Sequence, residues 1–77
     1  DLPTEEERKQ IFNVLLKKKR PDTINSFNVE NLAEKTKFFT GADIQQIIVD
    51  SMYKAFSESR EFTETDLLDE INIFQLH

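Results

Sequence analysis

Three phenylalanines in this chain are each followed by a helix-capping residue and, four positions after the cap, by an aliphatic residue. The three segments begin at Phe27, Phe39 and Phe62. This spacing is that of a hydrophobic staple, in which the residue before the cap packs on the first turn. After Thr40 and Thr63 an Asp also follows three positions later, which is the capping-box pattern. The pattern predicts three helix starts, each with its own apolar contact.

A fourth helix is expected before these three. Thr4 and Glu7 form another capping box, and a basic run ends the segment just before Pro21. We expect four helices, at about residues 4–19, 29–36, 41–57 and 64–75. No window alternates apolar and polar residues for long enough to predict a strand. The expected fold class is all-α, a small four-helix bundle that forms one domain over residues 1–77.

Apolar residues at helical spacing define the expected core. The widest stripe belongs to residues 41–57, so we expect that helix to be central. The expected core residues are Ile11, Phe12, Val14, Leu15, Leu16, Ile24, Phe27, Val29, Leu32, Ala33, Ile44, Ile47, Ile48, Val49, Ser51, Met52, Ala55, Phe56, Leu67, Leu68, Ile71 and Phe74.

Composition excludes several function classes. The net charge of −5 argues against nucleic acid as a partner, and no apolar run approaches the length of a membrane span. No cysteine is present, which fits a reducing compartment. One histidine, His77, and one glycine cannot build a histidine-based catalytic or metal site or a phosphate loop. We therefore expect no catalytic residue, no metal site and no membrane contact in this segment, which starts without Met and resembles a piece of a longer protein.

Two other functions are also compatible with the sequence. The acidic faces suit a free-standing helical module that binds a basic partner. Asp50-Ser51-Met52 resembles the phosphopantetheine motif of acyl carrier proteins, but Ser51 falls among the expected core positions. Glu64, Asp66, Asp69 and Glu70 are more typical of a solvated helix face than of a cation site.

Gly41 is the only glycine, and it falls in the first turn of an expected helix. Gly costs about 1 kcal/mol relative to Ala inside a helix. Close approach of a ligand to the helix end would explain its presence. A first-turn glycine of little consequence would explain it equally well.

The segment Phe39-Thr40-Gly41-Ala42-Asp43-Ile44 resembles the motif aromatic-Ser/Thr-Gly-Ala-Asp-Leu/Ile in the C-terminal helical lid of AAA ATPases. Four further segments resemble lid segments in the same order and at the same spacing. They are Leu2 to Arg8 with Ile11, Asn31 to Thr36, Asp50 to Ala55, and Phe62 to Leu67. The resemblance covers nearly the whole chain.

This resemblance implies a role in binding ATP or ADP. An upstream α/β subdomain would carry the phosphate loop and the residues for Mg²⁺, so the whole protein would hydrolyse ATP and this fragment alone would bind no cofactor. Gly41 and Ala42 would face the nucleotide, Ile11 would contact the adenine, and Leu15 would lie close by.

The resemblance also implies partners. The lid would contact the catalytic subdomain and the neighbouring subunits of a homo- or hetero-hexamer. Nucleotide-driven motion would then remodel or unfold a protein substrate, in the manner of a chaperone-like unfoldase in the cytoplasm.

Two positions depart from the family pattern. Leu15 stands where many members have a histidine, and Phe38 stands where they usually have a glycine in a left-handed conformation. Leu15 can pack on a base but cannot donate a hydrogen bond to it. Phe38 either strains its turn or adds an exposed aromatic side chain.

Overall fold

The computed structural model of the chain describes residues 1–76, and the expectation about His77 lies outside them. The described residues contain no strand, which confirms the all-α fold class. Each α-helix begins and ends within one residue of the range expected for it. The elements are α1 (Glu5–Lys19), the short 3-10 helix η1 (Ile24–Ser26), α2 (Val29–Lys35), α3 (Gly41–Ser57) and α4 (Glu64–Gln75).

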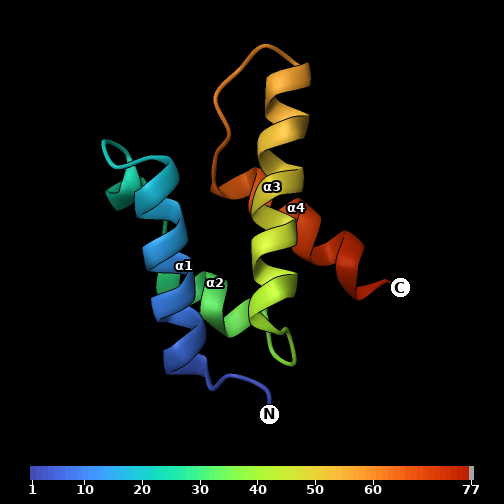
Figure 1. Cartoon of the computed structure of the whole chain (residues 1–77). Coiled ribbons are helices and arrows are strands. Elements are labelled where there is room, and N and C mark those ends of the chain that lie inside the picture. Colours follow the sequence, from blue (N-terminus) through green and yellow to red (C-terminus); the bar gives the residue numbers. More distant parts are fainter. Residues whose placement is uncertain (77) are drawn as a thin grey trace.

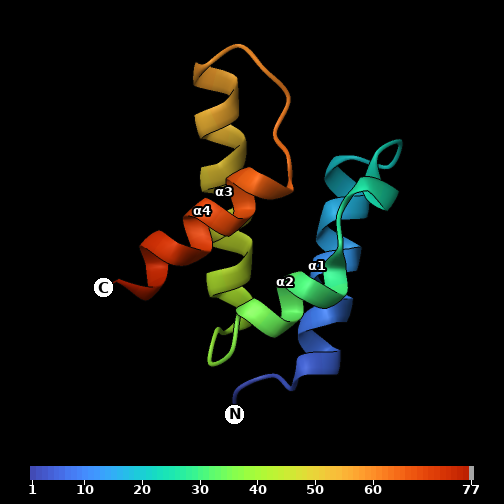
Figure 2. The same cartoon turned by 180° about the vertical axis from the view of Figure 1, so that it is seen from behind.

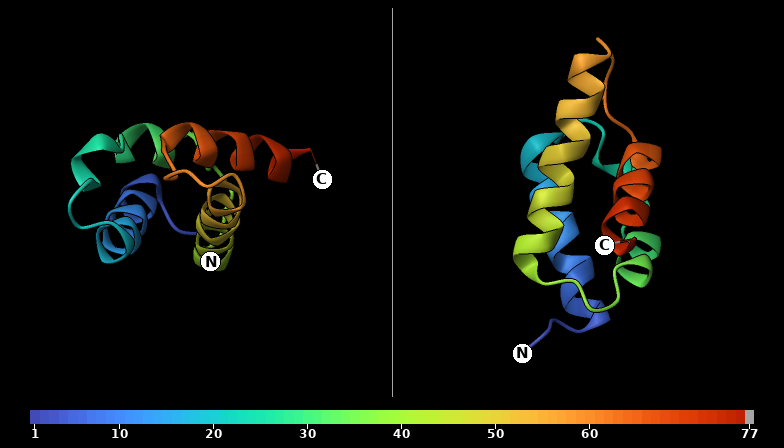
Figure 3. Two further views of the ribbon diagram at one scale, coloured as in Figure 1. Left: turned by 90° about the horizontal axis from the view of Figure 1, so that it is seen from above. Right: turned by 90° about the vertical axis from the view of Figure 1, so that its right-hand side faces the viewer.

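The helices lie in two layers. In the first layer, α1 and α3 run side by side in the same direction, so both amino-terminal ends lie at one end of the molecule (Figure 1). In the second layer, α2 packs on α1 and α4 packs on α3, as the view from behind shows (Figure 2). The view from above separates the two layers (Figure 3). This arrangement gives the α1–α3 pair a distinct amino-terminal end and a distinct carboxy-terminal end.

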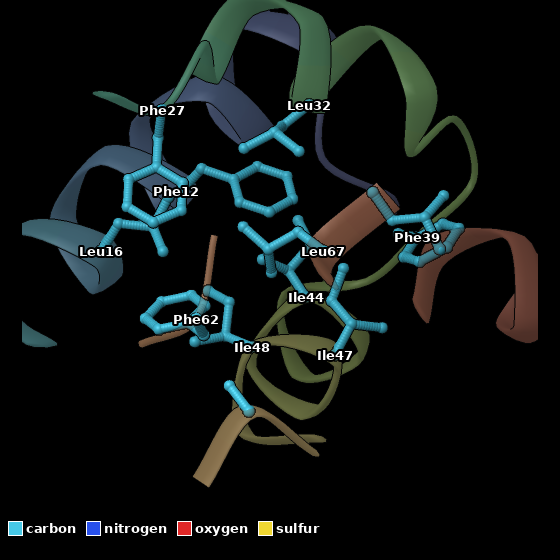
Figure 4. Close-up of a cluster of buried hydrophobic side chains, with 12 residues drawn as sticks. Phe12, Leu16, Phe27, Leu32, Phe39, Ile44, Ile47, Ile48, Phe62 and Leu67 are labelled. Atoms are coloured by element: carbon cyan, nitrogen blue, oxygen red, sulfur yellow. The ribbon is translucent and has the colours of Figure 1, made fainter. Parts of the chain in front are cut away.

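One apolar cluster joins the layers (Figure 4). Ile44, Ile47 and Ile48 of α3 are almost completely buried, which confirms that α3 is central. The buried apolar residues are Phe12, Leu16, Phe27, Leu32, Ala33, Phe39, Ile44, Ile47, Ile48, Ala55, Phe62, Leu67 and Ile71.

Three expected core residues are exposed, so those expectations were wrong. The side chain of Val14 is 64% exposed and that of Phe56 is 81% exposed. Both lie at the edge of an apolar stripe, where four short helices provide no further element to cover them. Phe74 is 39% exposed, although its ring lies 4.5 Å from that of Phe39.

The start of α3 is built by the groups that the sequence predicts. The Thr40 hydroxyl accepts from the N–H of Asp43 at 3.0 Å, and the Asp43 carboxylate accepts from the N–H of Thr40 at 2.9 Å. Two of the staple phenylalanines, Phe27 and Phe62, also pack on each other with ring centroids 5.3 Å apart. The starts of α2 and α4 are therefore held together by side chains that also define each helix start.

A buried carboxylate closes the connection between α3 and α4. Both oxygens of Asp66 accept from the guanidinium of Arg60 at 2.8 Å, and the N–H of Thr63 donates to the same carboxylate. These hydrogen bonds favour the charged form, with Arg60 the largest cause, and lower the pKa of Asp66 to about 2. The connection is thus held by an ion pair that needs an ionised Asp66.

Within residues 1–76, two residues other than glycine adopt a left-handed backbone. Phe38 has φ 72° in the turn between α2 and α3, and Ser59 has φ 56° just after α3. The Phe38 side chain is 73% exposed, so Phe38 both strains the turn and presents an aromatic ring to solvent. A positive φ is costly for a residue that carries a Cβ.

Candidate functional site

An open groove of about 960 Å³ lies between one face of α1 and the start of α3. The lead-in segment, which we define as residues 1–4, forms one of its sides. The groove is lined by Asp1, Leu2, Pro3, Thr4, Glu7, Gln10, Ile11, Val14, Leu15, Gly41 and Gln45. We call it the amino-terminal groove.

Three of the four residues predicted from the family resemblance line this groove. Ile11 and Leu15 lie one turn apart on α1 and are half-buried, and Gly41 begins α3 opposite them. The fourth residue, Ala42, is exposed and does not line the groove. The structure therefore brings Ile11, Leu15 and Gly41 together and leaves Ala42 beside them.

Gly41 borders the groove without backbone strain. Its φ is not positive, and a Cβ added there would lie 3.8 Å from Cδ1 of Ile11, an ordinary contact. An alanine would therefore fit. A longer side chain would extend past Ile11 into the groove. Glycine at residue 41 therefore matters because it leaves space in the groove, and the backbone conformation does not require it.

Arg8 holds the lead-in segment in place. Its guanidinium donates from Nη1 to the carbonyl oxygen of Pro3 at 2.9 Å and from Nε to that of Ala33 at 3.0 Å. The side chain is only 5% exposed. Ala33 lies in the last two turns of α2, where a cation is also favoured by the helix dipole. One buried cation thus connects the groove wall, α1 and α2.

The electrostatics of the groove suit an uncharged ligand surface. Its ionisable lining residues, Asp1 and Glu7, are acidic, and no lysine or arginine lines it. The Glu7 carboxylate takes part in the capping box of α1, where it accepts from the N–H of Thr4 at 2.8 Å. A phosphate would find no cation among these side chains, whereas a base or a sugar would meet the apolar surface of Ile11 and Leu15.

Comparison with known proteins places this arrangement in a family. The family model described as "AAA+ lid domain" matches residues 26–70, more than half of the chain. The chain belongs to the AAA+ lid domain family. The resemblance seen in the sequence is therefore confirmed. Of the residues that line the amino-terminal groove, Gly41 and Gln45 lie within the matched range.

Relatives of this lid include two proteins named "Uncharacterized AAA domain-containing protein ycf46". The one from Gracilaria tenuistipitata var. liui is 42% identical over 96% of the chain and 15% of its own length. The one from Trieres chinensis is 43% identical over 87% of the chain and 14% of its own length.

A "Proteasome-activating nucleotidase" from Saccharolobus solfataricus is 38% identical over 92% of the chain and 18% of its own length. No solved structure matches. The chain thus spans less than a fifth of the length of each of these relatives.

The structure argues against the acyl-carrier interpretation, because the serine that would carry the prosthetic group is buried. Ser51 is completely buried, and its hydroxyl donates to the carbonyl oxygen of Ile47 at 2.7 Å. A serine that receives a prosthetic group must be accessible. Ser51 instead fills a position in the core of the lid.

Three of the four acidic residues of α4 have separate partners. Glu64 accepts from the N–H of Asn28, Asp66 is held by Arg60, and Asp69 lies 3.5 Å from Lys54. Within residues 1–76, no group of three or more metal-binding side chains gathers. The same residues contain no helix that is long and apolar enough to cross a membrane.

Sequence reasoning missed Arg8 as a determinant of the groove. Its position one turn before Ile11 was visible, but its two acceptors are backbone carbonyls, one of them 25 residues away. Every residue has a backbone carbonyl, so the sequence does not show which carbonyls accept a hydrogen bond from a side chain. The only usable signal was an arginine among the apolar positions of an amphipathic helix.

Proposed function

We propose that this lid closes the adenine and ribose side of an ATP or ADP site in the full-length protein. Ile11 and Leu15 would pack on the base, and Gly41 would leave room for the nucleoside at the start of α3. The observation that supports this most is the convergence of Ile11, Leu15 and Gly41 on one groove. Family membership supports the nucleotide as the ligand.

The chemistry of the groove limits what the lid contributes. Because no cation lines the groove, the phosphates and any Mg²⁺ would be held by an upstream catalytic subdomain. The chain would supply apolar contact and shape, with no residue that reacts. Leu15 would replace a hydrogen bond from histidine with packing, so selection of the base would depend on shape and on other groups.

The lid would act through motion and assembly. Nucleotide bound between the lid and the catalytic subdomain would couple hydrolysis to a change in their relative position. Neighbouring subunits of a hexameric ring would receive that change and remodel or unfold a protein substrate in the cytoplasm. The relatives named proteasome-activating nucleotidase support such a role for the whole protein.

Gly41→Arg in the full-length protein tests the proposal. The arginine would extend into the groove and occupy the space assigned to the nucleoside. We expect the affinity for a fluorescent ATP analogue to fall roughly tenfold or more, which corresponds to about 1.4 kcal/mol or more. The lid should stay folded, because a Cβ at Gly41 meets no close contact.

Gln46→Arg is the matched control. Gln46 is exposed on the same helix and does not line the groove. The Gln46→Arg protein should bind the ATP analogue with unchanged affinity. Both variants should keep the thermal unfolding midpoint of the natural sequence. Unchanged affinity in Gly41→Arg would show that Gly41 is only structural and would remove the proposal.

A further inference from the structure

The opposite end of the α1–α3 pair carries a second hollow, of about 300 Å³. We call it the carboxy-terminal patch, and it is lined by Lys19, Arg20, Val49, Met52, Tyr53 and Phe56. It lies where α1 and α3 both end, away from the amino-terminal groove (Figure 1). Nothing in the proposed nucleotide role uses this surface.

Two aromatic side chains of the patch are exposed. Tyr53 is 72% exposed and Phe56 is 81% exposed, whereas Val49 and Met52 are half-buried between them. We call the half-buried pair the apolar floor of the patch. Exposed apolar surface beside a hollow is typical of protein-binding sites, and Tyr is enriched among the residues that dominate binding energy.

The patch also carries positive charge, because Lys19 lines it and two further lysines precede Lys19 in the last turn of α1. Lys17, Lys18 and Lys19 are exposed, and within residues 1–76 none of them takes part in an ion pair. Arg20 differs, because it pairs with Glu61 and lies over the ring of Phe62. Favourable interaction with the end of α1 accounts for cations in the last turn. It does not account for an exposed lysine, Lys19, in the lining of the same hollow as two exposed aromatic rings on a chain of net charge −5.

We propose that the carboxy-terminal patch docks an amphipathic acidic helix of a partner protein. The apolar face of that helix would lie on Val49 and Met52, between Tyr53 and Phe56. Its carboxylates would face the three lysines, which would raise the rate of association and set the orientation. The proposal does not depend on nucleotide binding in the amino-terminal groove.

Charge favours this occupant over the alternatives. Three unpaired lysines would neutralise few phosphates, so a nucleic acid would bind weakly to an otherwise acidic chain. An acidic helix uses both the lysines and the apolar floor.

Fluorescence anisotropy with the full-length protein tests the proposal. The probe is a labelled peptide of roughly 12 residues, with Leu along one helical face and Glu along the other. Phe56→Ser should weaken binding of this peptide roughly tenfold. The double variant Lys18→Glu, Lys19→Glu should weaken it several-fold at low salt and much less at about 1 M salt, because salt screens exposed charges.

Two controls distinguish binding at the carboxy-terminal patch from nonspecific hydrophobic binding of the peptide. Phe38→Ser also removes an exposed aromatic ring, but at the far end of α3, and should leave the affinity unchanged. A peptide with Lys in place of each Glu should bind at least tenfold more weakly, since like charges meet.

Four results would overturn the proposal. The first is that the acidic peptide does not bind. The second is that Phe56→Ser retains full affinity. The third is that a single-stranded thymidine oligonucleotide binds more tightly than the peptide and is lost in the same variants. The fourth is that Phe56→Ser abolishes self-association of the protein, which would identify an interface between copies.

Discussion

The two ends of the α1–α3 pair share one core but present opposite chemistry. At the amino-terminal end, capping side chains satisfy the first turns, and the groove is lined by acidic and uncharged residues. At the carboxy-terminal end, three exposed lysines end α1, and one of them, Lys19, lines a hollow with two exposed aromatic rings. The first end is concave and neutral enough for a nucleoside, whereas the second suits a charged protein surface.

This difference follows from helix direction. Because α1 and α3 are parallel, their dipoles add, so the amino-terminal end carries partial positive charge and the carboxy-terminal end partial negative charge. Glu5, Glu6 and Glu7 offset the first, and Lys17, Lys18 and Lys19 offset the second. The lesson is that charges which stabilise parallel helices also determine which ligand each end can accept.

Replacing Arg8 should affect the amino-terminal end most. In Arg8→Met, the Pro3 carbonyl and the lead-in segment lose their anchor, while the aliphatic stem is kept. Loss of the two charge-assisted hydrogen bonds should lower the free energy of unfolding by about 2 kcal/mol. Urea unfolding of the protein measures this loss, and amide hydrogen exchange should increase in the lead-in segment.

Lys9→Met provides the comparison for that variant. Lys9 is half-buried, and its nitrogen lies 3.7 Å from the exposed carboxylate of Glu30, so its removal should cost at most about 0.5 kcal/mol. Binding of the acidic peptide to the carboxy-terminal patch should be the same in both variants. Equal destabilisation by the two changes would show that Arg8 does not anchor the lead-in segment.

Acid should weaken the carboxy-terminal end first, through Asp66. Its pKa is about 2 in the folded chain and 3.8 ordinarily, so its ionised form stabilises the fold above about pH 4. That stability is lost as the pH falls from about 4 to about 2 and amounts to about 1–2 kcal/mol after allowance for solvent screening. Urea unfolding at several pH values should show this loss, and Asp66→Asn should not.

Glu58→Gln checks that the loss belongs to Asp66. Glu58 also accepts from Arg60, at 2.8 Å, but it is exposed. Its variant should keep the same decline in stability between pH 4 and pH 2. If Asp66→Asn declined as steeply as the natural sequence, other carboxylates would be responsible.

The smallest effect concerns the two left-handed residues, one at each end of α3. Phe38→Gly should raise the free energy of unfolding by about 0.5–1 kcal/mol, because glycine adopts positive φ without a Cβ penalty. Ser59→Gly should act similarly at the other end. Thermal unfolding measures both, with Phe38→Ala as control. A gain in Phe38→Ala as large as that in Phe38→Gly would mean that the aromatic ring, rather than the φ angle, is unfavourable.

The helices could be predicted because their signals are local. A cap and a staple each lie within six residues of chain, from Phe39 to Ile44 in α3, and the structure builds the cap where the spacing placed it, at Thr40 and Asp43. The core followed from the same periodicity. Its edges did not, since the exposure of Val14 and Phe56 depends on whether another element lies opposite them.

The candidate site was predicted only in part, and this prediction came from a family resemblance instead of from local sequence signals. Ile11, Leu15 and Gly41 came from the family resemblance, because no local rule relates a glycine at residue 41 to the middle of α1. The pairing of Arg60 with Asp66 was missed, because it depends on how the α3–α4 connection folds back. Side chains that meet through tertiary structure carry no fixed spacing.

The anchoring of the lead-in segment has a mechanical consequence. A force applied to the chain at Asp1 reaches Pro3 and passes through Arg8 to the carbonyl oxygen of Ala33. The load is therefore shared between α1 and α2 instead of peeling the first turn of α1 away. Both helices in turn contact α3 and α4 through the common core.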